Sequence, residues 1–168
     1  MHKGKSLIEV LSSMNEHFLI LLFIATILVG FLQILFRTFL SIALPWAEEI
    51  SRYLFVYFIF GGAALAFKKG LFVCVDVVSK FIPKKLQFFM SLIIDVIVLL
   101  FFLIVSYIGI DLFLGASGQL TPALEIEIRY AYLAIPIFFI QMSFYAVNKI
   151  ISLCRKKMNN IKEAPYGS

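Results

Sequence analysis

Residues 45–67 read PWAEEISRYLFVYFIFGGAALAF, and this stretch places charged residues directly before a long apolar run. Two adjacent carboxylates, Glu48 and Glu49, and the cation Arg52 lie at its start, and the apolar run continues from residue 50 to residue 67. Charge at the mouth of a membrane span is costly unless it is solvated, paired or used. The stretch therefore predicts a membrane-spanning helix whose first turns hold charges that are solvated, paired or used in function.

The composition of the whole chain is that of a membrane protein. Of its 168 residues, 62% are hydrophobic and 15% are charged, and the mean hydropathy is +0.99. Soluble domains are closer to half apolar, so most of this chain is expected to have lipid as its solvent. One membrane domain covering residues 1–168 is the expected organisation.

Four apolar runs are long enough to cross a hydrocarbon core of ~30 Å at a helical rise of ~1.5 Å per residue. They cover about residues 18–40, 50–67, 86–114 and 130–151. The first is too long for a signal-peptide core and lacks a small-x-small cleavage site, which indicates a retained signal anchor. The third carries Asp95 and Asp111 and is long enough to tilt or protrude. The predicted fold class is an all-α integral membrane protein with four transmembrane helices.

The lysines predict the orientation of these spans. In a four-span arrangement all eleven lysines fall on one side of the membrane: Lys3, Lys5, Lys68, Lys69, Lys80, Lys84, Lys85, Lys149, Lys156, Lys157 and Lys162. The opposite connections contain only three arginines as cations, all near span ends. The positive-inside rule then places both termini in the cytoplasm.

Two connecting segments have an amphipathic pattern typical of interfacial helices. In residues 5–17 the apolar side chains recur at helical spacing, which favours a helix on the inner leaflet. Residues 71–82 are too short and too flanked by lysine to span, and Asp76 lies four residues before Lys80, a favourable order for a helical ion pair. A lipid-bound arm without a specific partner is the alternative for both.

Other classes of partner are disfavoured. The net charge of +5 arises from lysines beside apolar runs and not from a basic face on a soluble domain, so these lysines indicate topology and lipid headgroups rather than nucleic acid. Cys74 and Cys154 both fall on the cytoplasmic side and are expected to be free thiols. Neither has metal-ligand spacing to another cysteine or to a histidine.

The first turns of the second span allow two interpretations. Arg52 is four residues from Glu48 and three from Glu49, so it can pair with either on one helix face. One interpretation is a well-capped helix start, with Pro45 in the first turn and Trp46 in the headgroup belt. The other is that one carboxylate pairs with Arg52 while its neighbour faces another helix or subunit. Arg37, at the end of the preceding span, is one candidate partner within the chain.

Polar and small residues inside the spans suggest packing contacts. Asp95 lies about ten residues into the third span with no cation nearby in sequence, so it should be protonated, hydrated or matched by a polar partner. A structural contact is favoured over ion coupling, because a sodium site needs several oxygen ligands. Gly61 and Gly62 begin a patch of small residues that lets helices approach closely in lipid. Whether the neighbouring helix belongs to this chain stays open.

The sequence contains no catalytic constellation. The exit from the third span, residues 115–124, is rich in turn-forming residues, and Pro136 should kink the fourth span. No nucleophile–base pair, phosphate-binding glycine loop or metal cluster is present. An alternative is a self-contained four-helix redox or enzyme subunit. Haem ligation between its spans would need histidine pairs within them, and neither histidine is mid-span. A carrier similar to small multidrug exporters would need a central glutamate in the first span, which has none.

Four sequence pieces, taken in order, resemble the small (Q-type) membrane subunit of tripartite ATP-independent periplasmic (TRAP) transporters. They are residues 46–53 (WAEEISRY), residues 61–70 (GGAALAFKKG), residues 73–76 (VCVD), and residues 121–124 (TPAL) followed by Pro136 in the last span. Together they extend over roughly residues 18–151, nearly all of the membrane domain.

The resemblance implies a non-enzymatic subunit of the bacterial inner membrane, without a cofactor of its own. In that family a large membrane subunit carries the substrate and sodium sites and works as an elevator. A periplasmic binding protein delivers the substrate, usually an organic acid such as sialic acid or a C4-dicarboxylate. The small subunit packs on the large one and contributes to the docking surface. Candidate interface or structural polar residues are Arg37, Trp46, Glu48, Glu49, Arg52, Tyr53, Gly61, Gly62, Asp76, Asp95, Thr121 and Pro122.

Overall fold

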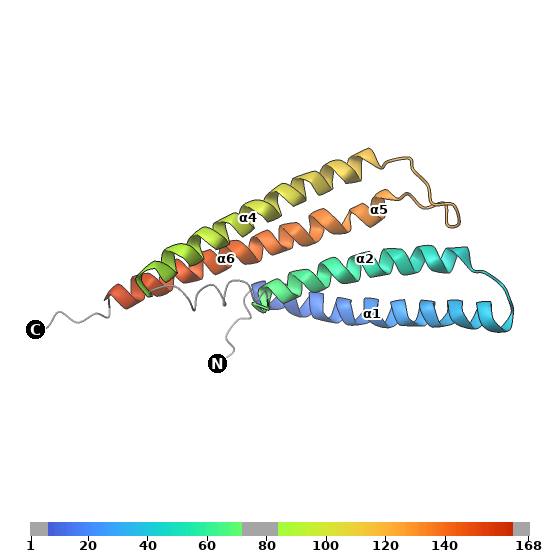
Figure 1. Cartoon of the computed structure of the whole chain (residues 1–168), viewed down its shortest axis with the longest axis horizontal. Coiled ribbons are helices and arrows are strands. Elements are labelled where there is room, and N and C mark those ends of the chain that lie inside the picture. The colour runs from blue at the N-terminus through green and yellow to red at the C-terminus, as the bar shows by residue number, and fades with distance from the viewer. Residues whose placement is uncertain (1–6, 72–83, 163–168) are drawn as a thin grey trace, which may run out of the picture.

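The structure is a computed structural model that describes residues 7–71 and 84–162. Its helices, in chain order, are α1 (Leu7–Phe39), α2 (Pro45–Lys68), α4 (Lys84–Gly115), α5 (Arg129–Tyr132) and α6 (Ala134–Lys162) (Figure 1). Four segments are long and apolar enough to cross a membrane: Ser13–Phe39, Pro45–Lys68, Gln87–Gly115 and Arg129–Arg155. The predicted four-span, all-helical architecture is confirmed, with boundaries that differ by a few residues.

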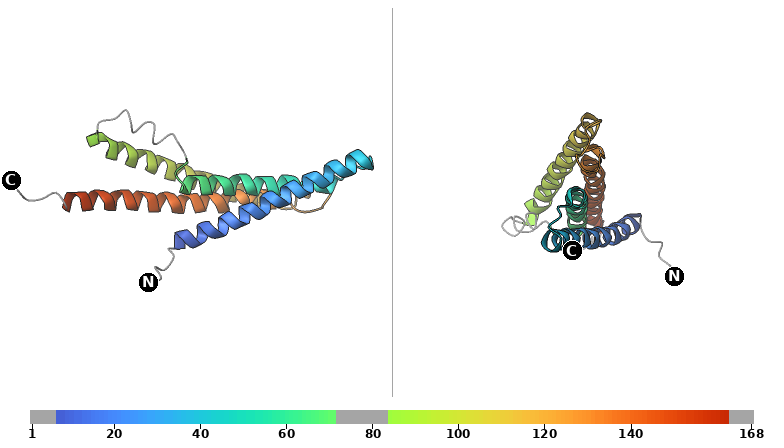
Figure 2. Two further views of the ribbon diagram at one scale, coloured as in Figure 1. Left: turned by 90° about the horizontal axis from the view of Figure 1, so that it is seen from below. Right: turned by 90° about the vertical axis from the view of Figure 1, so that its right-hand side faces the viewer.

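The helices form two hairpins that lie against each other. α1 packs on α2, α4 packs on α6, and α2 packs on α6 between them. Seen along the long axis, α1 and α4 lie on opposite sides of the central α2–α6 pair (Figure 2). The α1–α2 connection and residues 116–128 share one end, called the loop end below, and the start of α1 and the end of α6 lie toward the other, called the terminal end (Figure 1).

The core lies where α2, α4 and α6 meet. Its buried members are Ala64, Phe102, Ala134, Phe138, Met142 and Ala146. Edge-to-face contacts join its aromatic rings, such as Phe67 and Phe102 with centroids 5.0 Å apart. Alanine at the helix contacts lets the backbones approach, and the phenylalanines fill the remaining space.

The N-terminal segment is helical and is continuous with the first span. Residues 7–17, predicted to belong to an interfacial amphipathic helix over about residues 5–17, are the first turns of α1, which continues unbroken to Phe39. Two contacts hold these turns against the end of α2: Asn15 Nδ2 donates to the carbonyl oxygen of Gly61 at 3.4 Å, and Lys69 Nζ lies 3.0 Å from Glu16 Oε1. The segment contains neither proline nor glycine, so nothing in the backbone ends the helix there.

The second predicted interfacial helix, about residues 71–82, lies outside the described residues apart from Leu71. The same holds for Asp76 and Cys74. Their predicted roles stay predictions.

The fourth span is interrupted shortly before Pro136. α5 ends at Tyr132 and α6 begins at Ala134. Proline has no N–H to donate to the carbonyl four residues earlier, which here belongs to Tyr132. The interruption faces Gly109 of α4, where an added Cβ would lie 2.8 Å from Ile135 Cγ2 and 3.0 Å from Pro136 Cδ. The glycine therefore permits a close approach of α4 to the interrupted helix.

Candidate functional site: a loop held by a buried carboxylate

The first turns of α2 separate the two adjacent carboxylates. Pro45 occupies the helix start, as predicted, and the preceding Leu44 makes no side-chain cap. Glu48 pairs with Arg52, whose Nη2 lies 3.3 Å from Glu48 Oε1. Both side chains are largely exposed, with relative accessibilities of 64% and 72%. Of the two possible partners of Arg52, the structure thus selects Glu48.

Glu49 points the other way, into the molecule. Glu49 as a whole residue is 9% exposed. Oε1 accepts the backbone N–H of Ala123 at 3.0 Å and Oε2 accepts that of Leu124 at 2.9 Å. Hydrogen bonds from backbone N–H groups to a carboxylate are about twice as strong as neutral ones. Glu49 therefore fastens residues 121–124, on the connection between α4 and α5, to the start of α2.

The fastened segment is a compact turn with its own hydrogen bonds. Thr121 N–H donates to the carbonyl of Ile126 at 2.9 Å, and Ile126 N–H donates to the Thr121 hydroxyl oxygen at 3.3 Å. A bridge between Leu120 and Glu127 continues the pairing. Pro122, which has no N–H, precedes the two N–H groups that Glu49 accepts. The turn therefore presents its backbone donors to one carboxylate in a fixed geometry.

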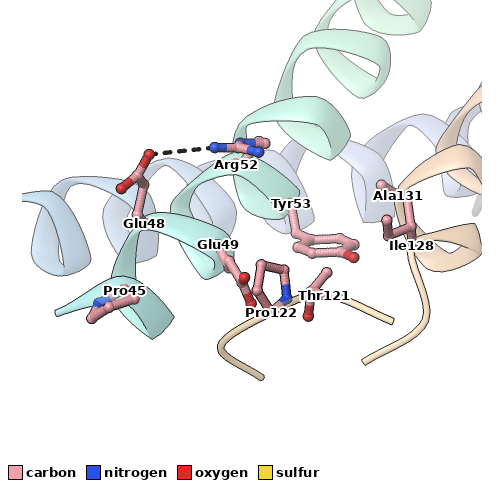
Figure 3. Close-up of a pocket in the computed structure, with 9 residues that line it drawn as sticks. All are labelled: Pro45, Glu48, Glu49, Arg52, Tyr53, Thr121, Pro122, Ile128 and Ala131. Atoms are coloured by element: carbon pink, nitrogen blue, oxygen red, sulfur yellow. Dashed lines mark hydrogen bonds and ion pairs between the residues drawn. The ribbon is translucent and has the colours of Figure 1, made fainter. Parts of the chain in front are cut away.

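A cleft of about 330 Å³ lies between α2 and this turn. Its lining residues are Pro45, Glu48, Glu49, Arg52, Tyr53, Thr121, Pro122, Ile128 and Ala131 (Figure 3). In Figure 3, Glu49 is directed toward Pro122 and Thr121, while Glu48 and Arg52 lie together on the other side of α2. Six of the predicted candidates thus line one cleft: Glu48, Glu49, Arg52, Tyr53, Thr121 and Pro122.

Two further candidates lie beside this cleft. Arg37, in the last turn of α1, lines a smaller hollow of about 250 Å³ together with Glu48. It forms no ion pair with any residue that the structure describes, so the proposed pairing of Arg37 with a carboxylate of α2 is not seen. Trp46, in the first turn of α2, is 38% exposed at the loop end, a position compatible with the headgroup belt.

The two candidate glycines, Gly61 and Gly62, differ in how closely other helices approach them. A Cβ on Gly61 would lie 2.7 Å from Leu19 Cδ2 of α1 and 3.1 Å from the Phe138 ring of α6, so Gly61 marks a crossing of three helices of this chain. A Cβ on Gly62 would meet nothing within 4 Å. Of the two glycines, only Gly61 therefore lies at a close helix contact within the described chain.

Asp95 has a cation partner that lies far from it in sequence. Its Oδ1 accepts a hydrogen bond from Lys149 Nζ at 2.8 Å, and its side chain is 3% exposed. The pair joins α4 to α6, as expected for a structural polar contact. Asp95 Oδ2 is buried and has no hydrogen-bond partner within the described chain.

Some contacts that organise this region were absent from the sequence-based candidates. Lys149 was interpreted only as a topology lysine, and Gly109 and Asn15 were not singled out. Tyr57 also links helices, since its hydroxyl donates to the carbonyl of Tyr130 at 2.7 Å. Among the described residues, no three His, Cys, Asp or Glu side chains gather in a way that could hold a metal ion. The polar groups of the site make structural contacts and present charge at one end of the bundle.

Four membrane-length helices joined by polar contacts near their ends define a multi-pass membrane protein. The comparison with known proteins agrees with this class and narrows it. The chain belongs to the family of tripartite ATP-independent periplasmic transporters, DctQ component, whose family model matches residues 26–156.

Two curated relatives come from Haemophilus influenzae. A protein named "Sialic acid TRAP transporter permease protein SiaT", from strain 86-028NP, is 29% identical over 123 residues, which cover 73% of this chain and 20% of that protein. A protein named "Putative TRAP transporter small permease protein", from strain Rd, is 26% identical over 136 residues, covering 81% of this chain and 82% of that protein. The chain thus spans about one fifth of the first relative and most of the second.

The family assignment confirms the predicted resemblance and settles the class of activity. Members of the DctQ family are transporter subunits and not enzymes, which removes the alternative of a self-contained redox or enzyme subunit. Small permeases of this family work with a large permease subunit. The assignment of individual residues to a partner interface stays a prediction.

Proposed function

We propose that this chain is the small permease subunit of a sodium-coupled TRAP transporter in a bacterial inner membrane. It packs on and anchors a large elevator subunit that carries the substrate and sodium sites. With that subunit it forms the docking surface for a periplasmic substrate-binding protein. The observation that carries this proposal is the match of the DctQ family model to residues 26–156 of a four-span chain.

The lysine distribution supports an orientation with both termini in the cytoplasm. Positive charge in short connections favours the cytoplasmic side. The described lysines near span ends, Lys68, Lys69 and Lys149, are all at the end of the bundle opposite the α4–α5 connection. The loop end, with the cleft and the Glu48–Arg52 pair, then faces the periplasm, where a binding protein arrives.

The geometry of the loop end supports a docking role. Residues 121–124 are held by Glu49 through two backbone hydrogen bonds, so the turn presents a fixed surface. The adjacent Glu48 and Arg52 keep most of their side-chain surface exposed. A preorganised surface limits the entropy lost on association, and exposed charges steer the encounter of two proteins.

The family resemblance and the relative's name support a proposed substrate class. One curated relative is named as a sialic acid permease, and we extend that substrate, an organic acid, to the transporter that contains this chain. A C4-dicarboxylate is the second candidate. Uptake of labelled sialic acid and labelled succinate by cells that lack and then regain this chain discriminates the two.

The first test is assembly with the large subunit. When an affinity-tagged large subunit is co-expressed with this chain, we expect both to be recovered together from detergent-solubilised membranes. A deletion strain should lose uptake and regain it from a plasmid copy. Recovery of the large subunit alone, together with unchanged uptake in the deletion strain, would refute the proposal.

The docking role has a test of its own. The variant Arg52→Glu reverses one exposed charge, and the double variant Glu48→Arg with Arg52→Glu restores an ion pair with opposite polarity. Both should assemble with the large subunit, because the native pair is exposed and contributes little to stability. If the polarity of this patch guides docking, both variants should show weaker uptake when the concentration of the binding protein is limiting. Uptake equal to that of the unmodified chain in both variants would exclude this patch.

A further inference from the structure

The outward face of α4 carries an unpaired carboxylate within a long apolar stripe. Seven exposed residues follow one another at alternating spacings of four and three: Ile93, Ile97, Leu100, Ile104, Tyr107, Asp111 and Leu114. Such spacing keeps side chains along a single helix face and fits the packing of a second helix at a shallow angle. The opposite face of α4, with Asp95, Phe102 and Gly109, packs inside the chain.

Two members of this stripe are polar and face outward. Tyr107 is 76% exposed. Asp111, one turn further, is exposed and forms neither an ion pair nor a hydrogen bond with the residues that the structure describes. Tyrosine and aspartate four residues apart give an otherwise apolar face one hydroxyl group and one carboxylate, which can accept hydrogen bonds or pair with a cation.

Along the bundle axis, Asp111 lies farther from the loop end than the start of α2 does. Gly109 contacts Ile135 and Pro136, so Asp111 is level with the interruption between α5 and α6. Tyr57 bonds to Tyr130 near this level, and from Tyr57 the helix α2 continues for twelve more residues, ~18 Å, to its start. Figure 1 shows the same relation, because α4 ends well short of the loop end of α1 and α2.

A lipid environment does not suit this carboxylate. Ionisable residues in hydrocarbon are costly and normally face a bundle interior, water or a partner charge. Lysine and arginine can extend their long side chains to the headgroups, but aspartate has a single methylene group. A second copy of the chain packed across a two-fold axis would place Asp111 near its own equivalent, and like charges repel.

We infer that the α4 stripe is the contact surface for a transmembrane helix of the large permease subunit, and that this helix presents an arginine or lysine opposite Asp111. The stripe supplies apolar contacts along its length, and the charge pair fixes the register, as polar residues do between helices in membranes. This inference rests on the proposed function, because it needs the large subunit.

Photo-crosslinking tests the surface directly. A benzoylphenylalanine introduced at Tyr107 is compared with one at Phe31, an aromatic position that is 59% exposed on α1, the helix across the bundle from α4 (Figure 2). The full chain is co-expressed with the tagged large subunit. We expect a light-dependent adduct of the two subunits at Tyr107, with a yield several-fold above that at Phe31. Equal yields, or an adduct at Tyr107 with a second copy only, would overturn the inference.

Charge variants test the pairing. Asp111→Leu and Asp111→Arg should each reduce recovery of the chain with the large subunit several-fold, while Asp111→Glu retains it. If the side chain faced lipid, Asp111→Leu would assemble as well as the unmodified chain, and that result would overturn the inference. When the unmodified chain itself fails to assemble, the proposed function fails. When it assembles but gives no adduct at Tyr107, only this inference fails.

Discussion

Glu49 and Ala123 are 74 residues apart in sequence, and the carboxylate of the first accepts the backbone N–H of the second at 3.0 Å. This contact, together with the parallel bond to Leu124, joins the start of α2 to the connection between α4 and α5. It gives the two adjacent glutamates different tasks. Glu49 holds the loop, and Glu48 stays at the surface with Arg52.

Replacement of Glu49 should therefore destabilise the protein more than replacement of Glu48. Glu49→Gln retains one oxygen acceptor but places an amide NH₂ group against the second backbone donor, which loses its partner. We expect Glu49→Gln to lower the midpoint of thermal unfolding in detergent by several degrees. Glu48→Gln is the matched control and should leave the midpoint unchanged, since the exposed pair contributes little. Equal midpoints for the two variants would contradict the role of Glu49.

The Asp95–Lys149 pair should respond asymmetrically to mutation. Lys149→Met leaves the buried Asp95 carboxylate without its cation, whereas Asp95→Leu leaves a lysine that is 40% exposed and can reach water. We expect Lys149→Met to cost roughly 2–4 kcal/mol, a discounted value for a pair that is only partly buried, and Asp95→Leu to cost less.

A double-mutant cycle measures this coupling. The variant with both Asp95→Leu and Lys149→Met should recover much of the loss, because no unpaired charge remains buried. Unfolding in mixed detergent micelles reports the free energies. Strictly additive losses would show that the two side chains do not interact.

Gly109 should tolerate a methyl group poorly. Gly109→Ala brings a Cβ to 2.8 Å from Ile135 Cγ2, 3.0 Å from Pro136 Cδ and 3.2 Å from Ile135 Cβ, and neither the proline ring nor Ile135 Cβ can move away without the backbone. We expect a loss of about 1–3 kcal/mol, as for overpacked cores. Gly62→Ala is the matched helix-interior control, with no neighbour within 4 Å, and should be neutral or slightly stabilising. If Gly109→Ala left the free energy of unfolding unchanged, that result would contradict the close approach of α4 to α6 at Gly109.

Hydropathy was sufficient to predict the four spans because lipid requires long apolar helices, whatever the tertiary contacts. It could not decide between Glu48 and Glu49, since both are within helical reach of Arg52. The deciding contact lies on a loop from the other hairpin. In the same way, Asp95 looked solitary because Lys149 is 54 residues away in sequence.

That residues 7–17 form one continuous helix with the first span was also not predicted. Amphipathic spacing continues smoothly into the first span, and no residue between 7 and 17 ends a helix. The contacts from Asn15 to Gly61 and from Glu16 to Lys69 that hold α1 in line come from α2. The importance of Gly109 was equally hidden, because it depends on the residues of α6 that lie opposite.

The orientation of the chain can be tested by cysteine labelling in intact cells. In a background with Cys74→Ser, native Cys154 lies near the terminal end and is exposed, and Ser117→Cys introduces a thiol on the α4–α5 connection. A maleimide that cannot cross the inner membrane should label position 117 and not position 154 until the membrane is permeabilised. Labelling of Cys154 in intact cells would contradict the assigned orientation and would place the cleft on the cytoplasmic side.

Transport by a reconstituted system tests the central claim most directly. Vesicles are prepared from the large subunit with and without this chain, and are supplied with the periplasmic binding protein, a labelled organic acid and an inward sodium gradient. We predict sodium-driven uptake only in vesicles that contain both subunits. Equal uptake by vesicles that contain the large subunit alone would contradict the assignment of this chain as a required small permease subunit.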